Sequence, residues 1–245
     1  MLNSYTHICL GLAIIAFLFP IAVYLNGMLF GIELQPTISH YYFAPGISNP
    51  PPNFVNPAKY RDPLDHPVRI LFVGVLFTIG IFLLLYKGFT RRENAILNLA
   101  GVLALGVAIL PMGRINFFIG IRPYGIDATP HLCCGFTMFA CMTYISLHAR
   151  HDTIRLFENP KLRDRYEFRY RWLGWLMMLS PVLALILNGI VGNQHTYVFF
   201  AESFGIWMFA FFWWVKSNEL KDLTREPRTA TLLRKHFLSP YSLSS

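Results

Sequence analysis

The chain has 245 residues, of which 54% are hydrophobic and only 14% charged, and its mean hydropathy is +0.43. Soluble domains carry about a quarter charged residues, so this composition excludes an ordinary soluble protein and indicates a membrane protein. The formal net charge is +8 at pH 7, but the basic residues are distributed by loop as membrane topology requires, so we expect no nucleic-acid partner.

Six stretches are apolar and long enough to cross a bilayer core of about 30 Å as helices. They cover approximately residues 8–30, 70–87, 95–112, 129–148, 172–192 and 196–215. Because these spans account for about half of the chain, we expect one all-α transmembrane domain over residues 1–245 and no sizeable soluble part.

The Lys and Arg residues predict the orientation. With six spans, both termini share a side with the loops at 88–94 and 149–171, and this side holds 16 Lys or Arg residues against 5 on the other. The positive-inside rule therefore places both termini in the cytoplasm. Attraction to anionic lipid is a second use for these charges.

The first span, residues 8–30, lacks the basic flank and small-residue cleavage motif of a signal peptide, so we expect a retained helix. Pro20 removes one backbone hydrogen bond within it and is expected to kink it. The four cysteines, at positions 9, 133, 134 and 141, all fall within predicted spans. No disulfide framework is therefore expected.

The connection over residues 32–68 is the longest of the chain and carries eight of its sixteen prolines. A loop of this length without helical or strand periodicity is either disordered or functional, often as a lid. Polar side chains gather at its two ends: Ser39 and His40 at the first, and Asp65, His66 and Arg69 at the second. The simplest interpretation of the second group is a solvated helix start with Asp65 near the positive helix end.

The second and third spans carry four glycines, Gly74, Gly80, Gly101 and Gly106. Small residues let membrane helices approach closely, so we expect these two spans to form a tight pair. At the start of the fourth span, His131 and Cys134 are three residues apart and share a helix face. A single pair of this kind is weak evidence for a metal, and an interfacial histidine with a solvated ring is the commoner case.

Two basic segments are predicted outside the spans. The loop 149–171 is basic and aromatic, and we expect it to lie along the membrane as a short amphipathic helix. The tail 217–245 mixes both signs of charge and is predicted as a fraying cytoplasmic helix. The fifth and sixth spans are separated by very few residues and must be adjacent and antiparallel.

Glu202 is the only acidic residue that falls within a predicted span. An ionised side chain there costs roughly 2.5 to 3.5 kcal/mol on insertion scales, so we expect Glu202 to have a partner, a raised pKa or a function. His195 precedes it by seven residues, which places both on nearly the same helix face, roughly 10 Å apart along the axis.

Plotted on this topology, the outer half of the bundle collects the polar side chains, and the inner half offers no comparable set of buried ionisable groups. We therefore predict an outward-facing polar pocket covered by the proline-rich loop, with Arg69 or a histidine compensating the charge of the glutamate. The candidate pocket residues are Glu202, His195, His131, Asp65, His66, Arg69, Ser39 and His40.

Several short motifs carry a resemblance to a known family. They are Ile38-Ser39-His40-Tyr41-Tyr42, Arg69-Ile70-Leu71-Phe72-Val73-Gly74, Tyr86-Lys87-Gly88, Asn98-Leu99-Ala100-Gly101, His131 and Glu202-Ser203. In this order they resemble a family of bacterial six-helix multi-pass membrane proteins with no assigned activity. The resemblance covers most of the chain and implies residence in the bacterial inner membrane. The insert after Phe43 departs from the shorter loops of that family.

Three classes of function remain open. The first is a non-catalytic membrane protein whose outer pocket binds a lipid or another amphiphile, with membrane lipids as its partners. The second is a metal-dependent hydrolase in which His131, His195 and Glu202, or Asp65, bind catalytic zinc. This set resembles the CREST membrane hydrolases, although six spans stand in place of seven and no His-x-x-x-His pair lies on the last span. The third is a proton-coupled transporter that uses Glu202. A b-type haem between His131 and His195 is a further alternative.

Overall fold

The computed structural model describes residues 2–44, 66–110, 130–149, 153–191, 196–225, 229 and 231. The long helices are α1 (Leu2–Leu29), α2 (Pro67–Leu85), α3 (Arg91–Ile109), α4 (Pro130–Tyr144), α6 (Pro160–Val191) and α7 (Tyr197–Arg225). A short 3-10 helix, η1 (Ile38–Tyr42), follows α1, and a π-helical turn, η3 (Ile145–Ala149), extends α4. No strand occurs in these ranges, and six helices are long and apolar enough to cross a membrane. The prediction of an all-α, multi-pass membrane protein is confirmed.

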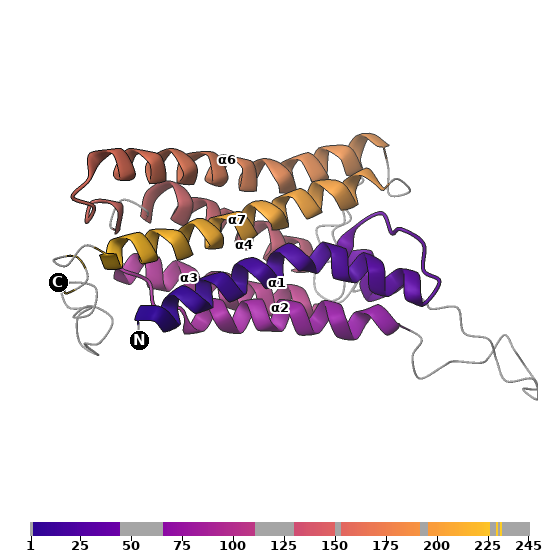
Figure 1. Cartoon of the computed structure of the whole chain (residues 1–245). Helices are drawn as coiled ribbons and strands as arrows, with labels where there is room; N and C mark the ends of the chain where they lie inside the picture. Colours follow the sequence, from indigo (N-terminus) through magenta and orange to yellow (C-terminus); the bar gives the residue numbers. More distant parts are fainter. Residues whose placement is uncertain are drawn as a thin grey trace, which may run out of the picture.

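The six long helices form a bundle in which each packs against the next along the chain and α7 returns to α1 (Figure 1). Hydrogen bonds tie α7 to both of its neighbours. The indole of Trp207 donates to the carbonyl oxygen of Phe17 on α1 at 3.1 Å, and Ser180 on α6 donates to the carbonyl oxygen of Ala201 at 2.6 Å. In the apolar segment of α7, 61% of the positions are buried, against 22% in the apolar segment of α6. The last helix therefore supplies much of the core.

The glycines bring α2 and α3 together as expected, but unequally. A methyl group added at Gly101 would lie 2.8 Å from the carbonyl oxygen of Gly80, and one added at Gly80 would lie 3.0 Å from the carbonyl oxygen of Gly101. Gly106 would meet the sulfur of Cys134 at 3.0 Å, whereas Gly74 has nothing within 4 Å. The backbones of α2 and α3 cross at Gly80 and Gly101, where no side chain separates them.

Two helices are longer than predicted, and the structure corrects both segments. Helix α6 begins at Pro160, so residues 160–171 of the predicted basic loop 149–171 belong to the span and not to a separate helix along the membrane. The side-chain oxygen of Asn159 accepts a hydrogen bond from Lys161 N at 3.0 Å and caps this start. Helix α7 runs to Arg225, with Leu220 and Leu223 fully buried, so the first part of the predicted tail 217–245 is packed. Hydropathy marks only the apolar part of a helix, and polar residues that find partners extend it.

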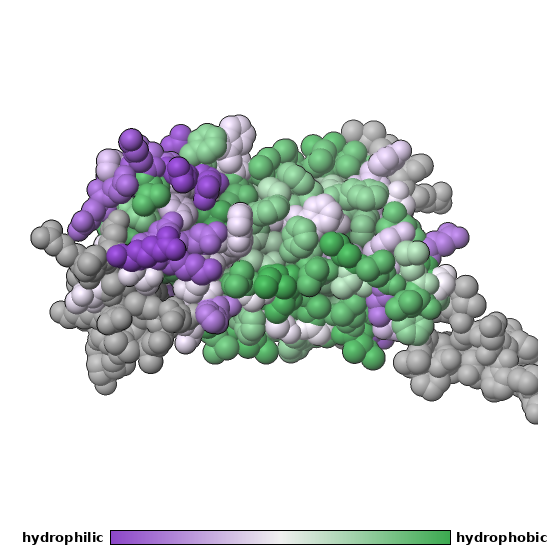
Figure 2. Space-filling view, in the orientation of Figure 1, coloured by the Kyte–Doolittle hydropathy of each residue, from purple (hydrophilic) through white to green (hydrophobic). Residues whose placement is uncertain are grey.

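The surface divides into an apolar part and a charged end. Large apolar side chains are exposed along most of the bundle, while hydrophilic side chains gather where α1 begins, α6 begins and α7 ends (Figure 2). We call this region the charged end, and the opposite one the η1 end. This division is the one expected of a bundle that exposes its apolar surface to lipid.

Candidate functional site

The η1 helix closes one end of the bundle and positions most of the predicted site. The hydroxyl of Thr37 caps it by accepting a hydrogen bond from His40 N at 3.1 Å. Ile38 and Tyr41 are almost wholly buried, and the Tyr41 ring lies 6.2 Å from that of Phe199 on α7. This short segment therefore acts as a plug that packs against the long helices.

Arg69, near the start of α2, contacts the C-terminal end of η1. Its Nε donates to the carbonyl oxygen of Tyr42 at 3.0 Å, and its guanidinium lies 4.6 Å from the centre of the Tyr42 ring and 5.7 Å from that of Phe43. Arginine stacks readily on aromatic faces in this way. Arg69 thus contacts the plug, and no ion pair joins it to Glu202.

His131 joins three elements. Its Nδ1 lies 2.8 Å from the carbonyl oxygen of Leu110, which follows α3, and its Nε2 lies 2.9 Å from the hydroxyl oxygen of Ser39 on η1. A carbonyl oxygen only accepts, so Nδ1 carries the proton and Nε2 accepts the hydrogen bond that the Ser39 hydroxyl donates. The imidazole is 6% exposed. Its tautomer and orientation are therefore fixed by a backbone group on one side and by the plug on the other.

Glu202 meets the plug from α7. Its Oε2 accepts a hydrogen bond from the backbone N of Ile38 at 2.8 Å. This N–H group belongs to the first turn of η1, where backbone donors have no partner within the helix. No Lys, Arg or His among the described residues lies within ion-pair distance of this carboxyl group. The expected partner exists, but it is an uncharged backbone amide.

The structure thus gathers Ser39, His40, His131 and Glu202 around η1, and Arg69 contacts the same helix. His40 bonds locally, with its Nδ1 2.6 Å from the Thr37 hydroxyl, and burial lowers the pKa of its imidazole below the usual 6.5. His66 precedes α2, and its Nδ1 is buried without a hydrogen-bond partner among the described residues. Asp65 and His195 lie outside the described residues.

The predicted metal ligands are tested only in part. Within the described ranges, no three His, Cys, Asp or Glu side chains stand close enough to hold a metal ion. Both ring nitrogens of His131 are engaged in hydrogen bonds, so zinc or haem ligation at this histidine requires one of those bonds to be released. The third proposed ligand, His195, lies outside the described residues.

A second polar cluster, which the sequence analysis missed, lies at the charged end. Lys216 and Glu219 are one helical turn apart on α7, their Nζ and Oε2 atoms are 3.1 Å apart, and their side chains are 5% and 0% exposed. Lys216 also donates to the hydroxyl of Thr153 at 3.0 Å, and Tyr170 on α6 donates to Glu219 Oε2. The prediction that the inner half holds no comparable buried ionisable set is therefore wrong.

A signal for this cluster was present in the sequence. Lys216, Glu219, Leu220 and Leu223 repeat at the helical spacing of the apolar positions Phe209 and Phe212, which are buried on the same helix. Assigning the span to its apolar residues alone ended it before this repeat. Lysine and glutamate side chains that follow a core-facing repeat are candidates for a buried pair, because an isolated buried charge is too costly.

Comparison with known proteins adds no assignment: no family model, no curated protein and no solved structure matches this chain.

Proposed function

We propose that this protein is a non-catalytic membrane protein that binds an amphiphile at its η1 end, with Glu202 receiving the polar head. The proposal places it in the bacterial inner membrane with the charged end in the cytoplasm. The amphiphile that suits the site carries hydrogen-bond donors on its head, such as the ammonium group of phosphatidylethanolamine.

One observation carries this proposal: the carboxyl group of Glu202 has unfilled hydrogen-bond acceptor positions. A carboxylate offers about four acceptor positions, and among the described residues this one accepts a single hydrogen bond, from Ile38 N. Phe199, one turn earlier on α7, lies 6.2 Å from the Tyr41 ring of η1, and both belong to one buried apolar cluster. In such surroundings a donor that reaches the second oxygen is favoured strongly, because water competes poorly for it.

The test compares two variants that each replace one carboxyl group near the same end with an amide. Glu202→Gln keeps the size of the side chain, and Glu33→Gln is the matched control on an exposed glutamate. Each purified protein is mixed with fluorescent phosphatidylethanolamine or with its phosphatidylglycerol counterpart in detergent micelles. We expect wild type and Glu33→Gln to prefer the ammonium headgroup, and Glu202→Gln to lose about tenfold in affinity, the order expected from a charge-assisted hydrogen bond. Equal binding by all three proteins would refute the assignment.

A hydrolytic function is the second candidate, because Ser39 and His131 have the arrangement of a nucleophile and its base. The Ser39 hydroxyl donates to His131 Nε2 at 2.9 Å, and the Leu110 carbonyl holds the other ring nitrogen. In this mechanism Ser39 Oγ attacks an ester carbonyl, Nε2 takes the hydroxyl proton and returns it to the leaving alcohol, and water then cleaves the acyl-enzyme. A fluorophosphonate probe should label wild type and not Ser39→Ala. Absence of labelling in wild type would refute the hydrolytic function, and the Ser39–His131 contact would then serve only to hold η1 against the bundle.

A further inference from the structure

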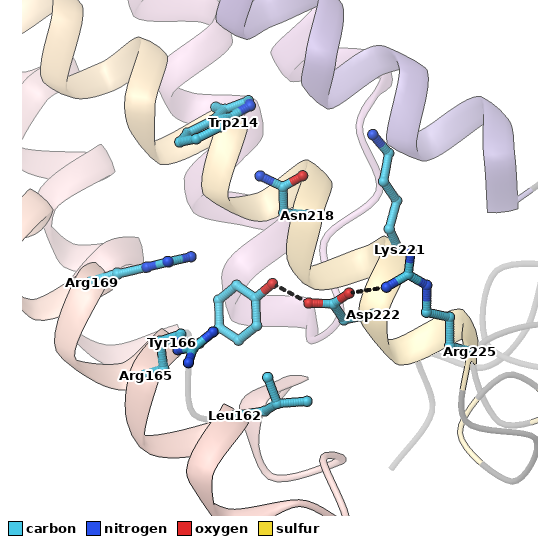
Figure 3. Close-up of a pocket in the computed structure, with 9 residues that line it drawn as sticks. All are labelled: Leu162, Arg165, Tyr166, Arg169, Trp214, Asn218, Lys221, Asp222 and Arg225. Atoms are coloured by element: carbon cyan, nitrogen blue, oxygen red, sulfur yellow. Dashed lines mark hydrogen bonds and ion pairs between the residues drawn. The ribbon is translucent and has the colours of Figure 1, made fainter.

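At the charged end, the first turns of α6 and the last turns of α7 enclose a groove of about 350 Å³ (Figure 3). Residues of α6 at three- and four-residue spacing form one wall, from Leu162 to Arg169, and residues of α7 from Trp214 to Arg225 form the other. This volume falls in the range of sites that hold one small ligand or headgroup.

The groove is strongly cationic. Among the described residues that line it, four are basic, namely Arg165, Arg169, Lys221 and Arg225, and one is acidic, Asp222. Both oxygens of Asp222 are engaged: Oδ1 lies 3.2 Å from Arg225 Nη1, and Oδ2 accepts a hydrogen bond from the Tyr166 hydroxyl at 2.7 Å (Figure 3). Asp222 therefore orients Arg225, and no other described carboxylate lines the groove.

Arg165 and Arg169 extend from α6 toward the groove, whereas Lys221 extends away from α6 (Figure 3). The Arg169 guanidinium lies 5.7 Å from the centre of the Tyr166 ring. Arg165, Arg169 and Lys221 are exposed, and none of them has a carboxylate within ion-pair distance in the described part of the chain. Other arginines of α6 differ in this respect: Arg171 lies 3.3 Å from Glu167, and Arg163 lies 3.9 Å from Asp164. The unpaired arginines are thus concentrated on the face of α6 that lines the groove.

The position of the groove indicates what kind of anion it binds. Its rim includes Leu162 and the half-exposed indole of Trp214, and the adjoining surface is where the apolar part of the bundle meets the charged end (Figure 2). Tryptophan favours this headgroup level of a bilayer, and one guanidinium group can donate two parallel hydrogen bonds to the oxygens of one phosphate. A ligand with a phosphate head and an acyl tail matches both parts.

We propose that the α6–α7 groove is a binding site for the phosphate headgroup of one anionic phospholipid, with Arg165 and Arg169 holding the phosphate and Trp214 contacting the start of the acyl chains. This site lies at the opposite end of the bundle from Glu202 and uses none of the residues of the proposed amphiphile site. Either assignment can fail without the other.

The experiment uses the full-length protein in nanodiscs that contain phosphatidylcholine and a small fraction of lipid with brominated chains. Bromine quenches nearby tryptophan fluorescence, and Trp214→Phe identifies the part of the signal that arises in the groove. We expect brominated phosphatidylglycerol to quench Trp214 more than brominated phosphatidylcholine does. Arg165→Gln with Arg169→Gln should weaken this preference by about fivefold for each guanidinium removed.

The matched control is Arg163→Gln with Arg171→Gln, which removes the same charge from the same helix outside the groove. It should retain the preference of wild type. An equal loss of lipid preference in the control would show that the effect arises from general surface charge, and it would overturn the proposal. An unchanged preference in the groove variant would overturn it as well. Inorganic phosphate added at matched ionic strength should not abolish the preference. If it does, the groove binds a soluble anion and the lipid assignment is wrong.

Discussion

The buried pair Lys216–Glu219 gives the sharpest prediction about stability. Replacing Lys216 with Met keeps the length of the side chain and removes its charge. The change leaves Glu219 0% exposed with Tyr170 as its remaining hydrogen-bond donor, since Glu219 Oε1 has no partner among the described residues. Removing one member of a buried ion pair costs about 3 to 5 kcal/mol, because the remaining charge is buried and uncompensated.

The same reasoning predicts a rescue. In the double variant Lys216→Met with Glu219→Gln, neither charge remains, and an amide keeps a hydrogen-bond acceptor for the Tyr170 hydroxyl. Replacing both members of a buried pair is often neutral or stabilising, so the double variant should recover most of the lost stability. For a chain of this length, the single variant should lower the unfolding temperature by roughly 6 to 20 °C.

The assay is thermal unfolding in detergent, followed by the fraction of protein that still elutes as a monodisperse peak after heating. Arg171→Gln is the control, because its pair with Glu167 is exposed and such pairs contribute about 0 to 1 kcal/mol. The reasoning is refuted if the double variant is no more stable than Lys216→Met alone, or if Lys216→Met unfolds at the same temperature as Arg171→Gln.

Two further predictions follow from the packing and the plug. Gly101→Ala should destabilise the protein by about 1 to 3 kcal/mol, because the added methyl group would lie 2.8 Å from the Gly80 carbonyl oxygen. Gly74→Ala is the control, because the space at that position is open, and it should leave the stability unchanged. Equal unfolding temperatures for the two variants would contradict the close approach of α2 and α3. Burial lowers the pKa of His40 below 6.5, so the unfolded state takes up a proton first as the pH falls, and the stability present above pH 6.5 is lost progressively below it. His40→Gln should make the unfolding temperature less dependent on pH between about 7 and 5, and an unchanged pH profile would show that His40 does not contribute.

The sequence was most informative where one physical requirement decides the answer. A span needs about 20 apolar residues, so the six helices could be predicted from hydropathy. Glu202 stood out because a carboxyl group among apolar residues needs a partner. Its partner could not be predicted, because the donor is the backbone N of Ile38, and a backbone amide leaves no mark in residue identity.

Other features depend on where helices extend beyond their apolar parts. Hydropathy ended the last span near residue 215, and α7 in fact continues to Arg225 with Lys216 and Glu219 inside the core. The pair escaped prediction because Tyr170 and Thr153, which bond to it, belong to a segment predicted as a surface loop. Likewise, the Ser39–His131 contact joins residues 92 positions apart, a proximity that only the packed bundle creates.

The closing of the bundle by α7 on α1 bears on the order of assembly during synthesis. The helix that supplies Glu202, Lys216 and Glu219 is the last of the six to leave the ribosome, and its neighbours include the first. Until it arrives, Tyr170, Thr153 and the amide of Ile38 lack the partners they have in the finished protein. A nascent chain stalled before residue 197 therefore lacks the carboxyl groups that accept hydrogen bonds from the Tyr170 hydroxyl and the Ile38 amide.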